Sequence, residues 1–314
     1  MKNAMRKSLT RSTLATSFTA ALKGISQVLL IENAISGLLI LLAITTYSYF
    51  LGIITLLSAI IGNAVGRFGG ADEKSINQGL FGYNSVLTGI ALALFLTGPY
   101  HWIIALMGAA IASIFTAAMM HAFKNSGIPV LTFPFIILSW LMLLASYRLK
   151  LFQLTPDLVP QDLSNWEVDM TGKVDWLDGI FNGIGQIFFL DNALSGVLIF
   201  VAVFWAGWKF GVYAIIGNIV ALVTSYLLGG EPQLIFAGLY GYNAILTIIA
   251  VSRVFNTEYT RFNHVLGIIG ACLTVPLTAS IATLLIPFGL PALTMPFVLT
   301  TWLLLGARKV LPRL

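Results

Sequence analysis

Two nine-residue segments of the sequence place a threonine between two prolines in surroundings that are otherwise almost entirely apolar. They read GIPVLTFPF at 127–135 and GLPALTMPF at 289–297. Because proline has no amide hydrogen, Pro134 and Pro296 are each expected to leave the carbonyl four residues earlier without its helical donor. In the second copy that carbonyl belongs to Ala292. The sequence therefore predicts freed backbone oxygens at two equivalent places.

Thr132 and Thr294 lie two residues before these prolines and would add a hydroxyl beside each freed carbonyl. A run of carbonyl and hydroxyl oxygens at membrane depth suits a solute that carries several N–H donors. The alternative is a simple kink packed against neighbouring helices. The presence of two copies at matching places favours a solute path over a kink.

Two glutamines also occupy equivalent positions, Gln27 and Gln186. A neutral amide offers both a donor and an acceptor without the cost of burying a charge. Hydrogen bonding between helices is an equally good explanation for a glutamine within a membrane. The pair is therefore a candidate for solute binding on the strength of its repetition.

Two GLxGYN blocks each place a tyrosine and a leucine on one helix face, namely Tyr83 with Leu87 and Tyr242 with Leu246. Two flat rings brought together across a pseudo-two-fold axis would form a slot that favours a planar guest. The alternative is that these aromatic rings face lipid or pack within the bundle. Glycines in the same blocks would let the backbones approach closely.

Glu32 and Asp191 are the only carboxylates expected within apolar spans, and each is followed by an asparagine, Asn33 or Asn192. An acid inside a membrane is by default a functional hypothesis, here proton or cation coupling. Each acid–asparagine pair is also followed by a Ser–Gly pair. This pattern favours a structural polar cluster that caps a half-helix or fixes the duplicated halves together.

No catalytic, metal or cofactor site is expected. The three histidines have no counterparts at repeat-equivalent positions, and neither a metal triad nor a Ser/His/Asp set can be assembled at one depth. The single cysteine, Cys272, cannot by itself form a cysteine-based metal site. No phosphate-binding loop is present, which argues against ATP-driven transport by this chain alone. We therefore predict that the protein is not an enzyme and uses no metal or cofactor.

The composition is that of an integral membrane protein. The chain has 314 residues, of which 58% are hydrophobic and 9% charged, and its mean hydropathy is +0.92. A soluble domain carries about 25% charged residues, and the apolar runs reach the roughly 20 residues that a transmembrane helix needs. No alternating strands that would suggest a barrel are seen. The net charge of +5 comes from residues scattered at span ends, so no nucleic-acid partner is expected.

The matched residues belong to a tandem duplication. GISQVLLIENAISGLLI (24–40) aligns with GIGQIFFLDNALSGVLI (183–199), and GLFGYNSVLT (79–88) aligns with GLYGYNAILT (238–247), both at an offset of 159 residues. The proline segments align at an offset of 162, and each is followed five residues later by a tryptophan. Three blocks in one order at a nearly constant offset indicate two homologous halves.

Each half is predicted to hold five spans and one short piece that enters the membrane partway. We expect spans at 22–48, 51–66, 85–97, 101–122 and 128–148, then at 181–208, 211–228, 244–256, 264–286 and 290–307, with short pieces at 76–84 and 235–243. The predicted organisation is a cytoplasmic lead-in (1–21), repeat 1 (22–149), a periplasmic acidic linker (150–180), repeat 2 (181–310) and a cytoplasmic C-terminus (311–314).

Charge sets the predicted orientation. With the N-terminus inside, every basic residue except Arg148, Lys150 and Lys173 falls on the cytoplasmic side, whereas the linker holds six of the twelve acids. An odd number of spans per half makes the halves inverted, and such folds form their path between the halves near the midplane. The predicted fold is an all-α membrane protein with two inverted five-span repeats, ten transmembrane helices plus two re-entrant half-helices around a central pore.

The doubled LPxxTxPF signature, relaxed at Ile128–Phe135 and intact at Leu290–Phe297, resembles that of the urea transporter family. The GLxGYN and QxxxxxNxxSG blocks agree with this resemblance in both halves. The resemblance implies a channel-like protein of ten spans plus two half-helices, assembled as a homotrimer with one pore per subunit.

The resemblance also implies roles for the paired residues. The two threonines would join carbonyls in an oxygen ladder that accepts the N–H groups of urea, and the two glutamines would bind urea at the mouths of the filter, beside the backbone carbonyls of Val28 and Ile187. Some bacterial members have Glu where Gln186 stands and Phe where both tyrosines stand. The predicted substrate-binding set is Gln27, Val28, Leu30, Tyr83, Leu87, Thr132, Gln186, Ile187, Phe189, Tyr242, Leu246 and Thr294.

We therefore expect passive, bidirectional permeation of urea across a bacterial inner membrane. Formamide and acetamide are further candidate solutes, and the expected partners are membrane lipid and further copies of the chain. An ammonia or ammonium channel is an alternative, but the sequence lacks the paired histidines of that family. A proton-coupled transporter that uses Glu32 and Asp191 is a second alternative, and an intramembrane enzyme is disfavoured because no nucleophile–base set is visible.

Overall fold

The computed structural model describes residues 15–165, 167–255 and 261–311. The basic residues Lys2, Arg6, Lys7 and Arg11 of the predicted lead-in therefore lie outside the described residues, as do the last three residues of the predicted C-terminus. Within the described ranges the chain is almost entirely helical, and strands are limited to the antiparallel pair β1 (Leu96–Thr97) and β2 (Gln153–Leu154). The expected all-α class is confirmed.

The first half begins with a helix over Ala15–Leu29, whose last turn is the 3-10 segment η1 (Gln27–Leu29). It continues with α2 (Ala34–Tyr47), α3 (Tyr49–Phe68), α4 (Glu73–Asn77), α5 (Tyr83–Phe95), α6 (His101–Ala122) and α7 (Phe133–Ala145). The linker includes β2 and the 3-10 turn η2 (Leu163–Asn165).

The second half repeats this order. Its elements are α8 (Trp176–Gly185), the 3-10 turn η3 (Gln186–Phe188), α9 (Ala193–Ala206), α10 (Trp208–Leu227), α11 (Pro232–Phe236), α12 (Gly241–Ile249) with the π-helical segment η4 (Ala250–Val254), α13 (Arg261–Leu285), the 3-10 turn η5 (Ile286–Phe288) and α14 (Met295–Val310).

Among the described residues, four helices are long and apolar enough to cross a membrane, namely α3, α6, α10 and the helix over Phe262–Phe288. Two further spans arise if each bent pair counts as one, because Ala15–Leu29 meets Ala34–Tyr47 at 76° and Trp176–Phe188 meets Ala193–Ala206 at 74°. Shorter apolar helices cover Tyr83–Phe95, Phe133–Ala145 and Gly241–Val254. The chain is a multi-pass membrane protein.

The bent pairs lie within the predicted spans at 22–48 and 181–208, and each bend has a local cause. Leu30 adopts a left-handed conformation with φ of 61°, and Asn33 then caps α2 by accepting from the amides of Ile35 and Ser36 at 2.9 and 3.0 Å. Phe189 and Asn192 repeat this arrangement before α9. A residue in the left-handed region cannot continue a right-handed helix, so each chain turns here.

The short pieces predicted at 76–84 and 235–243 each overlap a five-residue helix, α4 (Glu73–Asn77) and α11 (Pro232–Phe236). Each of these helices is followed by turns that lead into α5 or α12.

The proline segments start helices and do not kink them. Thr132 and Thr294 are the N-cap residues of α7 and α14, so each second proline falls in the first helical turn, where a missing amide hydrogen costs little. The predicted freed carbonyl of Ala292 accepts from the amide of Met295 at 3.3 Å, which corrects that expectation. The chain before each threonine is non-helical, and this is where the spans predicted from 128 and 290 differ from the structure.

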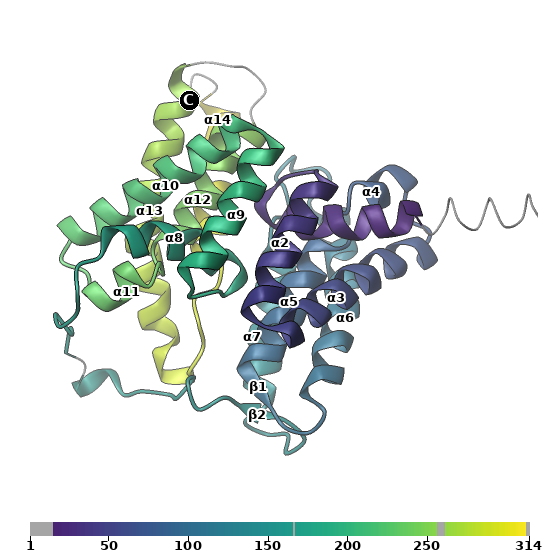
Figure 1. The fold of residues 1–314 in the computed structure, drawn as a ribbon, viewed down its shortest axis with the longest axis horizontal. Helices are drawn as coiled ribbons and strands as arrows, with labels where there is room; N and C mark the ends of the chain where they lie inside the picture. Colours follow the sequence, from purple (N-terminus) through teal and green to yellow (C-terminus); the bar gives the residue numbers. More distant parts are fainter. Residues whose placement is uncertain (1–14, 166, 256–260, 312–314) are drawn as a thin grey trace, which may run out of the picture.

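Two helical lobes correspond to the two halves, and α2 and α9 lie side by side between them (Figure 1). The Ser36 hydroxyl donates to the carbonyl of Ala202 at 2.7 Å, and the Ser195 hydroxyl donates to the carbonyl of Ala43 at 3.4 Å. These two contacts join equivalent residues in reciprocal fashion. The halves therefore meet through the same residues of each copy.

Candidate functional site

The two threonines of the proline segments are in contact with each other across the two halves. Their Oγ1 atoms lie 2.6 Å apart, and the side chains are only 2% and 4% exposed. Each threonine stands at the start of a helix that belongs to a different half, α7 or α14. We call this contact between Thr132 and Thr294 the threonine junction. It brings two hydroxyls together where the halves join.

The residue before each threonine presents its carbonyl to a tyrosine of the same half. The Tyr83 hydroxyl donates to the Leu131 carbonyl at 2.9 Å, and the Tyr242 hydroxyl donates to the Leu293 carbonyl at 2.7 Å. Both leucines have positive φ, 53° and 50°, which turns the chain immediately before the helix begins. The predicted tyrosines and threonines are thus brought together in both halves.

Two asparagines of the GLxGYN blocks hold the same carbonyls and were not predicted as site residues. Asn84 and Asn243 are fully buried, and each donates from Nδ2 to the leucine carbonyl at 3.3 Å. Asn243 Oδ1 also accepts from the amide of Phe297 at 3.2 Å. The signal was present in the sequence, since an asparagine follows the tyrosine in both copies.

The tryptophans that follow the proline segments fasten the two halves together. Trp140 Nε1 donates to the Pro291 carbonyl at 2.9 Å, and Trp302 Nε1 donates to the Pro129 carbonyl at 2.8 Å. Each tryptophan therefore bonds the proline segment of the opposite half. The extended backbone before each threonine is fixed by the other copy.

Gln27 and Gln186 make one matched contact each. Gln27 Nε2 donates to the backbone carbonyl of Gln78 at 3.0 Å, and Gln186 Nε2 donates to that of Ala237 at 3.1 Å. A carbonyl can only accept, so it fixes the amide group with its nitrogen toward this oxygen. The amide oxygen of each glutamine then remains as the acceptor available to a ligand.

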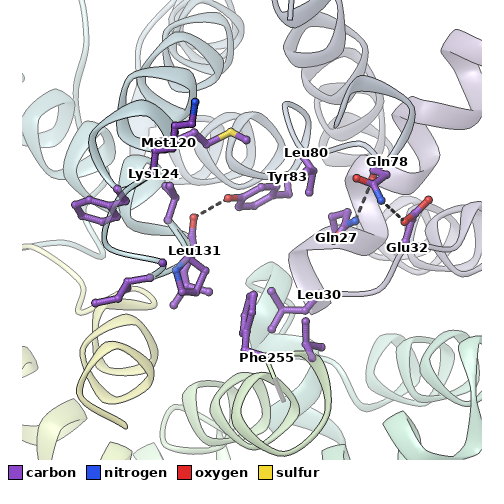
Figure 2. A pocket seen from close by; sticks show the side chains of 16 residues that line it. Gln27, Leu30, Glu32, Gln78, Leu80, Tyr83, Met120, Lys124, Leu131 and Phe255 are labelled. Atoms are coloured by element: carbon purple, nitrogen blue, oxygen red, sulfur yellow. Dashed lines mark hydrogen bonds between the residues drawn. The ribbon is translucent and has the colours of Figure 1, made fainter. Parts of the chain in front are cut away.

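A cavity of about 620 Å³ opens beside the first glutamine (Figure 2). Its walls include Gln27, Leu30, Tyr83 and Leu131 of the first half and Phe255 of the second. Figure 2 shows the Tyr83 hydroxyl pointing to the Leu131 carbonyl on one side and Gln27 on the opposite side of the hollow. We call this the Gln27 cavity. Its volume is larger than that of a single small planar molecule.

The rest of the predicted set lies deeper or in the other half. Val28, Leu87, Ile187 and Leu246 are each no more than 1% exposed. Phe189, the counterpart of Leu30, packs edge-on against Phe95 with ring centroids 5.4 Å apart. The lining of the Gln27 cavity does not include Gln186, Phe189 or Tyr242. The two glutamines are therefore not in one cavity.

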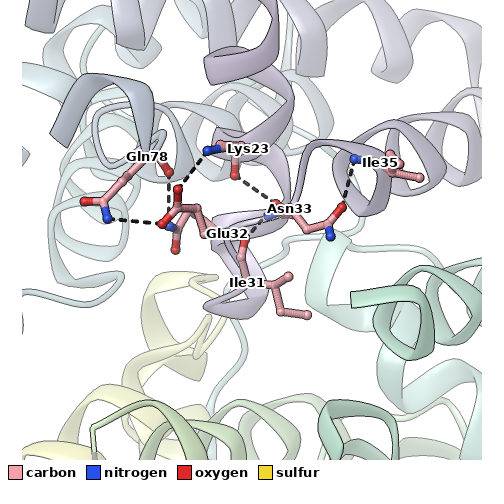
Figure 3. Close-up of polar contacts among 8 residues, drawn as sticks. Lys23, Ile31, Glu32, Asn33, Ile35 and Gln78 are labelled. Carbon is pink, nitrogen blue, oxygen red and sulfur yellow. Dashed lines mark hydrogen bonds and ion pairs between the residues drawn. The ribbon is translucent and has the colours of Figure 1, made fainter. Parts of the chain in front are cut away.

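The two acids lie at the breaks within the bent helix pairs and are exposed in the isolated chain. Glu32 Oε1 pairs with Lys23 Nζ at 2.8 Å, and its Oε2 accepts from Gln78 Nε2 at 3.1 Å (Figure 3). Asp191 Oδ1 accepts from the Tyr47 hydroxyl at 2.7 Å. The two acids therefore have different partners although their positions are equivalent.

Its apolar helices of membrane-spanning length make the chain a multi-pass membrane protein. A buried polar contact joins its two equivalent halves. A family model described as "UT: Urea transporter" matches residues 18–309. The chain belongs to the urea transporter family, as its motifs predicted.

Curated relatives match over most of the chain. Urea transporter 1 of Ovis aries, of Capra hircus and of Rattus norvegicus are each 28% identical over 289 residues, which is 90% of this chain and 75% of theirs. The match spans both halves and the linker between them.

Proposed function

We propose that this protein is a urea transporter with a channel-like mechanism, through which urea permeates passively in both directions. The observation that carries the proposal is the threonine junction, two buried hydroxyls 2.6 Å apart at the meeting point of the two halves. Membership of the urea transporter family and the similarity to urea transporter 1 support urea as the solute.

The chemistry of urea suits this interior. Urea is planar, neutral and rich in N–H donors, and it loses hydrogen bonds to water on entering a narrow path. Within the threonine junction one hydroxyl donates to the other, so both oxygens keep acceptor capacity. The amide oxygens of Gln27 and Gln186 offer acceptors of the same kind nearer the two ends. Together they would replace the hydration that urea gives up.

The proposed slot is formed by Tyr83, Leu87, Tyr242 and Leu246. Because the slot is flat, it would admit planar solutes in preference to bulkier ones. The tyrosine hydroxyls donate to the Leu131 and Leu293 carbonyls, so the rings would line the slot while the hydroxyls fix the backbone before each threonine. Apolar walls exclude ions because a desolvated charge finds no compensation there. Binding stays weak enough for release, which conduction requires.

The proposed architecture places the two repeats, 22–149 and 181–310, in inverted orientations with the acidic linker 150–180 outside and both termini in the cytoplasm. The reciprocal serine and tryptophan contacts support a two-fold relation between the halves. Location in a bacterial inner membrane, assembly as a homotrimer with surrounding lipid, and passage of formamide or acetamide are further parts of this proposal. The protein would act as a transporter, not as an enzyme, with no cofactor.

The contacts of the two acids favour a structural role over proton coupling. Glu32 is paired with a lysine and Asp191 with a tyrosine hydroxyl, so both carboxylates already have partners. Asn33 and Asn192 accept backbone amides at the starts of α2 and α9, where they stabilise the helix ends.

Uptake of labelled urea into proteoliposomes tests the proposal. We expect the internal concentration to rise to the external one and to stop there, with or without an imposed proton gradient. Protein-free liposomes are the control. Accumulation above equilibrium that requires the gradient would show proton-coupled transport and would contradict a passive channel.

A further inference from the structure

The two glutamines are held by equivalent carbonyls, but the two halves secure those carbonyls differently. In the first half Glu32 accepts from Gln78 Nε2 at 3.1 Å and pairs with Lys23 at 2.8 Å (Figure 3). The same residue, Gln78, supplies the backbone carbonyl that accepts from Gln27 Nε2 at 3.0 Å. A chain of three side chains therefore leads from Lys23 to the segment that orients Gln27.

In the second half, the backbone segment that orients Gln186 is held without a carboxylate. Asn182, which aligns with Lys23, donates directly from Nδ2 to the carbonyl of Phe236 at 3.1 Å. This carbonyl lies next to Ala237, whose own carbonyl orients Gln186. Ala237 aligns with Gln78 and has no side chain that could reach a carboxylate. Asp191 binds the Tyr47 hydroxyl of the opposite half instead.

We propose that Glu32 is a positioning residue for the Gln27 cavity: it holds the Gln78 segment through that side chain and so presents the amide oxygen of Gln27 to the incoming solute. This inference rests on the proposed function. Lys23 orients the carboxylate from within the Ala15–Leu29 helix. Glu32 thereby ties three segments together, that helix, the break before α2 and the turn after α4.

The two ends of the proposed path would therefore differ in how their glutamines are positioned. At the Gln27 cavity the acceptor is positioned by a charged chain, and at Gln186 by a neutral hydrogen bond between a side chain and the backbone. Hydrogen bonds in which the donor or the acceptor is ionised, such as that from Gln78 Nε2 to the Glu32 carboxylate, are stronger than neutral ones. Changes at Glu32 are therefore expected to affect solute binding, while the path through the threonine junction stays intact.

The test measures urea flux into proteoliposomes as a function of urea concentration. Glu32→Ala removes both acceptor oxygens, and we expect the half-saturating concentration to rise about fivefold with little change in maximal flux, as loss of one orienting hydrogen bond implies. Glu32→Gln retains an acceptor for Gln78 Nε2 and should stay within about twofold of the wild type. Asp191→Ala is the matched control at the equivalent position and should also stay within about twofold of the wild type.

A second variant and a hydrogen-exchange measurement test the role of Glu32 independently of the flux through Glu32→Ala. Gln78→Ala cuts the chain without touching the ion pair and should raise the half-saturating concentration as Glu32→Ala does, even if Glu32→Ala proves too unstable to purify. Hydrogen exchange of the backbone over 76–83 should accelerate in Glu32→Ala and not in Asp191→Ala. This second measurement needs no transport and therefore remains informative if the wild type carries no urea, a result that would refute the proposed function alone.

An unchanged half-saturating concentration in both Glu32→Ala and Gln78→Ala, with flux present in the wild type, would overturn the inference. Equal effects of Glu32→Ala and Asp191→Ala on flux, accompanied by equal losses of thermal stability, would also overturn it, because they would indicate a general structural role. Unaltered hydrogen exchange over 76–83 in Glu32→Ala would contradict the claim that Glu32 holds this segment.

Discussion

At the residue scale, the threonine junction joins the two halves, and the residue before each threonine is held by a tyrosine of its own half. Leu131 and Leu293 each present a carbonyl that already accepts from a tyrosine hydroxyl and an asparagine amide. The tyrosines therefore have two functions, since their rings form the walls of the proposed slot and their hydroxyls fix the backbone that carries the threonines.

Replacing the two tyrosines by phenylalanine separates these functions. Tyr83→Phe and Tyr242→Phe retain the rings but remove the donors, so each should cost about 1 kcal/mol of unfolding free energy through one lost hydrogen bond to the backbone. Urea permeability should stay within about twofold of the wild type, because the asparagine donor remains and the released carbonyl can accept from urea.

Thermal unfolding and urea flux of the same preparations check this prediction. Tyr100→Phe, at a residue that is 52% exposed, is the matched control and should change neither quantity. A tenfold loss of flux in either buried variant with unchanged stability would show that the hydroxyls themselves bind the solute.

The residues that occupy equivalent positions in the two halves were the part of the site that the sequence predicted best. Repetition alone drew attention to Gln27, Gln186, Thr132 and Thr294, and the structure places the threonines in contact. Asn84 recurs with its tyrosine in both copies, but its repetition alone did not reveal which group the amide binds. Its role depends on a carbonyl 47 positions away in the chain, which only the fold brings near.

At the scale of helices and turns, the direction of the backbone was harder to predict from the sequence than the pairing of residues. The run from residue 22 to 48 is predominantly apolar, although it holds Lys23, Gln27 and Glu32, and hydropathy predicts a span there without marking a bend. The 76° bend follows from the left-handed conformation of Leu30 and from the cap that Asn33 provides. Hydropathy records how apolar a segment is, and it does not record where the chain turns.

A close helix contact at this bend gives a prediction about glycine. In Gly37→Ala the new Cβ would lie 1.9 Å from the carbonyl oxygen of Leu22, which is backbone and cannot move aside cheaply. We expect destabilisation of about 3 kcal/mol or failure to fold, as overpacking of a tight interface implies.

Thermal stability of detergent-solubilised protein measures this effect. Gly306→Ala is the matched control, because nothing lies within 4 Å of its ideal Cβ, and it should be neutral or slightly stabilising. A Gly37→Ala variant as stable as Gly306→Ala would mean that the helices at the bend are not packed this closely.

At the scale of the whole molecule, the distribution of charge predicts how the chain is oriented in the membrane. The excess of basic residues outside the linker and the concentration of acids within it predict that the linker faces outward. The chain is well suited to a labelling experiment because Cys272 is its single cysteine.

In a Cys272→Ser background, a cysteine at Ser164 in the linker should react with a membrane-impermeant maleimide on intact cells. A cysteine at Asn125, in the exposed turn after α6, should react only after the cells are opened. Reversed labelling would invert the proposed topology, and labelling of both positions on intact cells would place the turn after α6 outside.

The central claim is that urea crosses the membrane past the threonine junction. Stopped-flow light scattering on proteoliposomes under an inward urea gradient tests it most directly, with the wild type, a Thr132→Val/Thr294→Val double variant and a Thr283→Val control at an exposed position of α13. We predict wild-type urea permeability well above that of protein-free liposomes and a loss of about tenfold in the double variant, since valine keeps the shape and removes both hydroxyls. The control should match the wild type. Wild-type permeability equal to that of protein-free liposomes, or a double variant that conducts as well as the wild type, would contradict the account.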